Sequence, residues 1–143
     1  MTSFVSHTTI DCADAYALSE WWKAQLGYVD LADDPNEPGH EECMILDPET
    51  GHHLLFIEVP DAAAAKARAV EAGAGKNRLH LDLRPRDRSR DEEVERLLAG
   101  GATLYADHRG TYGPGTGWVT LADPEGNEFC MLRSLAEVAA ATG

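Results

Sequence analysis

The chain has 143 residues, of which 43% are hydrophobic and 26% are charged, and this suits one globular domain that needs no disulfide or structural metal to fold. Its net charge of −13, from 12 basic and 25 acidic side chains, disfavours nucleic acid as a partner, because such binding relies on clustered lysines and arginines. The one basic run, residues 84–90, contains Asp87 and is interpreted as a solvated loop leading into a helix. No apolar run approaches the roughly 20 residues of a membrane span.

The cysteines and the N-terminus indicate where the protein works. Three cysteines without CxxC spacing are typical of a reducing compartment. The first residues lack the basic stretch and apolar core of a signal peptide. We therefore expect a cytoplasmic protein with no membrane partner.

The hydrophobic pattern alternates between strand and helix signals along the whole chain. In the first half we expect strands over 4–11, 28–31, 43–46 and 54–59, helices over 13–26 and 61–72, and a loop over 33–42. In the second half we expect strands over 78–83, 103–106, 118–121 and 128–132, a helix over 91–99, a glycine-rich loop over 110–117 and a short or frayed helix over 134–140.

The two halves repeat one pattern. His80 follows His7 by 73 residues, and Gly100 follows Gly27 by the same distance. An Asp-Pro-Glu turn with a following glycine, Asp47 to Gly51 and Asp123 to Gly126, comes later in each half. Such agreement in order and spacing indicates a duplicated module. We predict a single α+β domain over 1–143, with module one at about 3–60, a crossover helix at about 61–73 and module two at about 76–133.

Side chains alternate along strands, so each strand should have one face that packs under helices and one that faces a pocket. We assign to the helix-packing faces Leu55, Ile57, Val59, Leu79, Leu81, Leu83, Phe129 and Met131. We assign to the opposite faces His7, Leu54, Phe56, Glu58, Arg78, His80, Asp82, Glu128, Cys130 and Leu132. Two modules that close around one another would direct the second set into one shared pocket.

The polar residues of that set suggest a metal site. Two imidazoles, His7 and His80, with the carboxylate of Glu58 suit Zn, Ni, Mn or Fe(II) and leave positions open for substrate and water. A bound ion would polarise vicinal oxygens while Glu58, as the catalytic residue, or water handles a proton. The alternative for each histidine is a hydrogen-bonded or solvent-facing strand residue. For Cys130 it is a small buried hydrophobe rather than a ligand.

At these residues the chain resembles the glyoxalase/bleomycin resistance/extradiol dioxygenase group, the vicinal oxygen chelate superfamily, and its glyoxalase-like domain branch. Two phrases carry the resemblance, K-N-R-L-H-L-D-L at 76–83 and L-A-D-P-E-G-N-E-F-C at 121–130. It implies paired βαβββ modules that form a cupped eight-stranded mixed sheet around a shared pocket. It also implies metal ligands at His7, Glu58 and His80. Cys130 stands where metalloenzymes of the superfamily usually have a carboxylate.

Two functions follow from the resemblance. The first is a metal-assisted lyase or isomerase that acts on a small oxygenated metabolite. The second is a metal-free protein that binds a small molecule or antibiotic in the same cavity, as resistance-type members do. The expected substrate contacts are Phe56, Arg78, Asp82, Tyr112, Trp118, Glu128 and Cys130. We expect a homodimer, because two-fold assemblies are the commonest.

Overall fold

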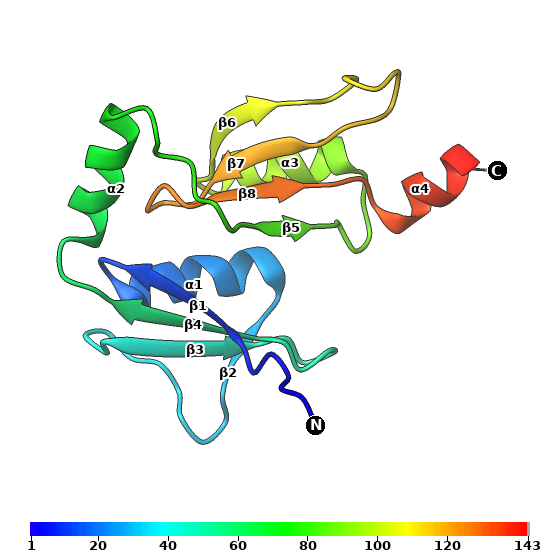
Figure 1. The fold of residues 1–143 in the computed structure, drawn as a ribbon. Coiled ribbons are helices and arrows are strands. Elements are labelled where there is room, and N and C mark those ends of the chain that lie inside the picture. Colours follow the sequence, from blue (N-terminus) through cyan, green and yellow to red (C-terminus); the bar gives the residue numbers. More distant parts are fainter. Residues whose placement is uncertain (143) are drawn as a thin grey trace. The chain divides into compact units, whose positions relative to one another are not determined.

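The computed structural model describes residues 1–142 and contains two four-stranded mixed sheets and four helices (Figure 1). The chain divides into two compact units, residues 1–72 and the part from Gly73 onward, which we call module one and module two. Each module follows the order strand, helix, three strands. The predicted α+β class and the tandem βαβββ modules are therefore confirmed. None of the helices in the described part combines the length and apolarity needed to cross a bilayer.

Module one packs one long helix against its sheet. Its elements are β1 (Thr8–Cys12), α1 (Ala15–Leu26), β2 (Val29–Asp30), β3 (Glu42–Leu46) and β4 (His53–Glu58), followed by α2 (Ala62–Glu71). The strand order is β1-β4-β3-β2, with β1 parallel to β4 and the other pairs antiparallel. Asp14 caps α1 through the Ala17 N–H, and Gly27 ends the helix at φ +70°.

Module two repeats this topology. Its elements are β5 (Leu81–Leu83), α3 (Arg90–Ala99), β6 (Thr103–Asp107), β7 (Val119–Ala122) and β8 (Glu128–Met131), followed by α4 (Leu135–Thr142). The strand order is β5-β8-β7-β6, with β5 parallel to β8. Every residue of β7 and β8 is buried, so these two strands form the centre of the module.

The two Asp-Pro turns have the same construction. Asp47 is buried and accepts hydrogen bonds from the Glu49 N–H and the Thr50 hydroxyl, both at 2.9 Å. Asp123 is also buried and accepts from the Glu125 and Asn127 backbone N–H groups. In each module an aspartate thus accepts hydrogen bonds from the hairpin that leads into the last strand, including one from the backbone N–H two residues after it. The duplication read from the sequence extends to these contacts.

The first strand of each module is shorter than predicted. β1 begins at Thr8 rather than at residue 4, and β5 begins at Leu81 rather than at residue 78. Thr8 pairs with Leu54 near the start of β4, and Leu81 pairs with Phe129 near the start of β8. The residues before Thr8 and before Leu81 are not paired with the neighbouring strand. Leu79, predicted to pack under a helix, is 91% exposed for this reason.

The face assignment for β4 was wrong. Leu54 and Phe56 are 0% exposed and pair across the ladder with Ile45 and Cys43, which are equally buried. Because α1 packs on β3 and β4, this apolar face lies under α1. Leu55 and the neighbouring odd-numbered positions therefore lie on the other face. Phe56 is thus a core residue beneath α1, and this position is not compatible with its predicted contact with substrate.

A buried arginine at the start of α3 fixes the glycine-rich loop of module two. Arg90 donates from Nη1 to the carbonyls of Thr116 and Gly117, at 2.8 and 2.9 Å. Gly117 has φ +86°, and a Cβ there would lie 2.0 Å from the carbonyl oxygen of His108. The loop therefore closes tightly on itself just before Trp118. The last arginine of the basic run is thus part of the core rather than of a solvated loop.

Replacing Arg90 by methionine should leave both loop carbonyls without their charged donor. We expect the free energy of unfolding to fall by about 2 kcal/mol, because buried acceptors lose their partner. Arg88→Met is the control, since the Arg88 side chain is 39% exposed, its partner Asp87 is exposed, and its buried partner Glu93 keeps its ion pair with Arg96. Urea denaturation of both variants measures this. Equal losses of unfolding free energy in the two variants would contradict the role of Arg90.

A second test concerns Asp107, at the end of β6. Arg109 hydrogen-bonds this carboxyl through its side chain and its backbone N–H, and lowers the pKa of Asp107 from 3.8 to about 2. The stabilisation is complete above pH 3.8 and is lost as the pH falls through about 2. Asp107→Asn should therefore be less stable than the wild type at pH 6, and the gap should narrow below pH 3.8. A gap that is constant from pH 6 to the lowest pH at which both fold would contradict this.

Candidate metal and substrate site

Module two contains a pocket of about 360 Å³ on the face of its sheet. This volume lies in the range of sites for small molecules. The pocket is lined by Lys76, His80, Asp82, His108, Trp118, Thr120, Cys130 and Leu132. His80, Asp82, Trp118 and Cys130 were predicted as site residues, whereas Lys76, His108 and Thr120 were not.

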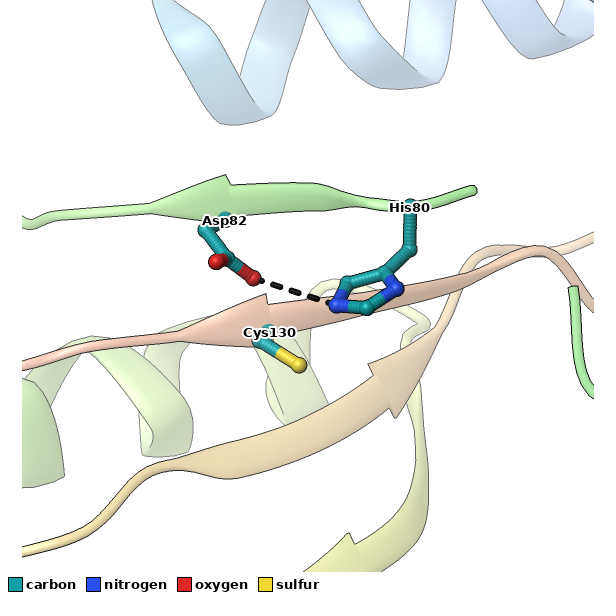
Figure 2. A group of neighbouring side chains, drawn as sticks. All are labelled: His80, Asp82 and Cys130. Carbon is teal, nitrogen blue, oxygen red and sulfur yellow. Dashed lines mark ion pairs between the residues drawn. The ribbon is translucent and has the colours of Figure 1, made fainter. Parts of the chain in front are cut away.

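Strand register places three of the lining residues in one row. Asp82 on β5 pairs with Cys130 on β8, and Cys130 pairs in turn with Thr120 on β7. His80 precedes Asp82 by two residues, so its side chain lies on the same face of the sheet. Figure 2 shows His80, Asp82 and Cys130 directed toward one another. The opposite face carries Leu81 and Phe129 in the same register, and this is the apolar face of the sheet.

The donor atoms of His80, Asp82 and Cys130 lie close together. His80 Nε2 is 3.3 Å from Asp82 Oδ1, and the three potential ligand atoms all lie within 4.8 Å of one another. Donors around a tetrahedral ion at ~2.0–2.3 Å lie roughly 3.3–3.8 Å apart. Side-chain rotations that move the donor atoms by about an ångström would therefore bring all three within bonding distance of one ion. An imidazole, a carboxylate and a thiol fit a divalent metal by both distance and chemistry. We call these three residues the donor triad.

Cys130 lies at the floor of the pocket and is 4% exposed. Its Sγ lies 3.3 Å from the Thr120 hydroxyl oxygen. Burial raises the pKa of the Cys130 thiol, and the nearby charge of Asp82 raises it further, while the Thr120 hydrogen bond and the charge of Lys76 act in the opposite direction. Without a metal this side chain is thus a neutral thiol, which argues against a free thiolate nucleophile.

Aromatic rings form one wall of the pocket. The ring centroids of His108 and Trp118 are 4.8 Å apart, and those of Tyr112 and Trp118 are 6.2 Å apart with the planes at 27°. Trp118 and His108 line the pocket, whereas Tyr112 is 74% exposed and stacks on Trp118. The loop held by Arg90 supplies this wall, because Trp118 directly follows Gly117.

Two other predicted contacts of module two lie outside the pocket lining. Arg78 is exposed in the segment before β5. Glu128 is 4% exposed, and its Oε2 accepts a hydrogen bond from the Asn77 N–H at 3.0 Å. The Glu128 carboxylate thus anchors the chain where it enters β5. That contact gives Glu128 a structural role next to the site.

Module one presents a different set of side chains. His7 is half-buried just before β1, and its Nδ1 lies 2.9 Å from the Ser6 hydroxyl. Glu58 lies on the Phe56 side of β4, and its Oε1 accepts from the Ala15 N–H at the start of α1 at 3.4 Å. His7 and Glu58 were predicted to share a face, and the alternation of β1 and β4 places them on opposite faces. Glu58 also borders an open cleft of about 600 Å³ with Glu41 and Val59.

Because the two modules repeat one topology, their residues can be compared at matching strand positions. The row Asp82–Cys130–Thr120 of module two corresponds in register to the row Thr9–Leu55–Met44 of module one. His80 corresponds to His7. Module one therefore keeps the histidine and has no carboxylate or thiol in the matching row. The donor triad belongs to module two alone.

Residues 7–132 match the family model described as the glyoxalase-like domain. No curated protein matches the chain by sequence. The fold is similar to that of a mutant of the fosfomycin resistance protein FosX from Listeria monocytogenes, solved with Mn(II) and 1S,2S-dihydroxypropylphosphonic acid. Identity is 16%, all of both chains is covered and the TM-score is 0.63.

Two further structures show the same fold. FosX from Mesorhizobium loti is 14% identical, with 98% of this chain and 99% of that chain covered and a TM-score of 0.59. A member of the glyoxalase/bleomycin resistance protein/dioxygenase superfamily from Sphaerobacter thermophilus is 18% identical, with 92% and 97% covered and a TM-score of 0.57. With the match over residues 7–132, the chain belongs to the glyoxalase-like domain family.

Proposed function

We propose that the protein is a metal-dependent enzyme of the glyoxalase type, a lyase or isomerase that acts on a small oxygenated metabolite in the pocket of module two. The observation that carries this proposal is the donor triad that lines that pocket, with two exposed members and the buried Cys130, and with its ligand atoms within 4.8 Å of one another. The FosX structure solved with Mn(II) and a phosphonate supports it at the level of the fold.

His80, Asp82 and Cys130 would hold the ion. Three protein ligands leave coordination positions open, as catalytic metal sites require. A bound ion supplies Lewis-acid polarisation of substrate oxygens. The predicted ligand set His7, Glu58 and His80 is thus revised to one centred on module two. His7 stays a predicted additional ligand, and Glu58 is left out because its carboxylate is directed to α1.

The remaining lining residues have distinct roles in the proposed reaction. Lys76 carries the positive charge that attracts an oxygen-rich, negatively charged substrate. Trp118 presents an apolar ring surface that excludes water from one side of the bound molecule. His108 also lines the pocket and is not part of the donor triad. We propose that His108 transfers the proton, the role predicted for Glu58 from the sequence.

A second function uses the same pocket without a metal. The stacked rings of His108, Trp118 and Tyr112 favour it, because such a wall can hold a flat or apolar ligand by stacking alone. In that case the protein binds a small molecule or antibiotic, as resistance proteins of this superfamily do. The metal content of the purified protein distinguishes the two functions.

We also propose that the protein is a cytoplasmic homodimer. Light scattering on the purified protein measures the number of subunits.

The metal prediction is tested on protein purified without a His tag. We expect one divalent ion per chain by elemental analysis, and loss of that ion in His80→Ala and in Cys130→Ser, because each removes a ligand. His40→Ala is the matched control, since His40 lies on an exposed loop of module one. His7→Ala, alone and with His80→Ala, shows whether the first histidine adds to the site. Wild-type protein that takes up no Zn, Ni, Mn or Fe would leave only the metal-free function.

A further inference from the structure

We infer that Cys130 binds the ion as a thiolate and makes the site of module two selective for a borderline-soft metal, Zn(II), in preference to Mn(II). This inference rests on the proposed metal site and specifies its chemistry. On binding, a bond forms between Sγ and the metal and the thiol proton passes to solvent. The ion keeps its oxidation state, so no other reactant is needed.

The first support is the position of Cys130. Its strand β8 is flanked by β5 and β7, so neighbours on both sides fix the location of Sγ. The residue is almost fully buried and still lines the pocket. It lies beside Asp82 across the ladder, and its Sγ lies within 4.8 Å of the potential donor atom of His80. A cysteine that served only as a small apolar residue would not need two metal-binding neighbours.

The second support is the Thr120 hydroxyl, 3.3 Å from Sγ. When Cys130 is ionised, this hydroxyl donates to the sulfur and stabilises the thiolate. Thr120 is itself 2% exposed, so its hydroxyl is held in a fixed position on β7. Outer partners of this kind orient metal ligands and change metal affinity. We therefore treat Thr120 as a positioning residue of the site.

The third support is ligand softness. Thiolates favour Zn(II) and other soft or borderline ions, whereas carboxylate, carbonyl and water favour Mn(II) and Mg(II). His80 and Asp82 alone form a nitrogen and oxygen set that accepts either class. Cys130 is thus the residue that determines the preference of the site for Zn(II) over Mn(II). Because most donor sets bind Zn(II) more tightly than Mn(II), the change in preference on substitution is the informative quantity.

The test uses the full chain freed of metal by a chelator and then given Zn(II) and Mn(II) in competition. Elemental analysis should find Zn(II) in the wild type. In Cys130→Asp, which supplies an oxygen donor at the same position, the Zn-to-Mn ratio should fall by at least about tenfold. Thr120→Val should weaken Zn(II) binding by roughly tenfold and leave the ion preference unchanged.

Cobalt supplies a direct readout of the Cys130–metal bond. Co(II)-loaded wild type should show the near-ultraviolet charge-transfer band of a thiolate ligand, and Cys130→Asp should lack it. Cys43→Ser, a change at an equally buried cysteine of module one, should keep the band. If the wild type binds Co(II) through His80 without such a band, the thiolate inference fails while the proposed metal enzyme stands. If no ion binds to the wild type, both fail.

Discussion

The parallel register of β5 on β8 is the constraint on which the site depends. It sets Asp82 beside Cys130, and the antiparallel register of β8 on β7 sets Cys130 beside Thr120. A shift of one residue would turn Cys130 toward the apolar face and replace it by Phe129 or Met131. The burial of Phe129 and Met131 on the helix side therefore fixes the chemistry on the pocket side.

The duplicated architecture explains how one module can carry the chemistry. Both modules use the same strand order and the same aspartate-anchored turn before the last strand. These shared features maintain the fold. The row on the sheet face away from the helix is free to differ, and it is Thr9–Leu55–Met44 in module one and Asp82–Cys130–Thr120 in module two. The wall of the pocket depends in addition on Arg90, which holds the loop before Trp118.

Much of the fold was predictable because the repeat is visible in the chain. The 73-residue spacing from His7 to His80 and the two Asp-Pro turns identify the modules, and alternation places Asp82 and Cys130 on one face of module two. Alternation failed in β4, where residues 54–57 are apolar at every position. The sequence of such a strand does not reveal which of its faces a helix covers. For this reason Phe56 and Glu58 were assigned to the wrong face of β4.

The loop residues of the lining were not accessible to a periodicity argument, although the family resemblance named Trp118 as a contact. His108 and Trp118 lie at the two ends of a glycine-rich loop, and their positions follow from the tertiary contact with Arg90. Lys76 lies in the segment that leads into module two, next to Asn77, whose N–H is held by Glu128. Loops of this kind take their shape from distant contacts rather than from local sequence.

The central claim is that His80, Asp82 and Cys130 hold one ion in the pocket of module two. A crystal structure of the Zn(II)-loaded protein, with anomalous data recorded on both sides of the zinc edge, tests it most directly. We expect one peak per chain, about 2.0–2.3 Å from the His80 imidazole, the Asp82 carboxylate and the Cys130 sulfur. A peak bound by Glu58 instead, or a well-occupied ion that does not contact Cys130, would contradict it.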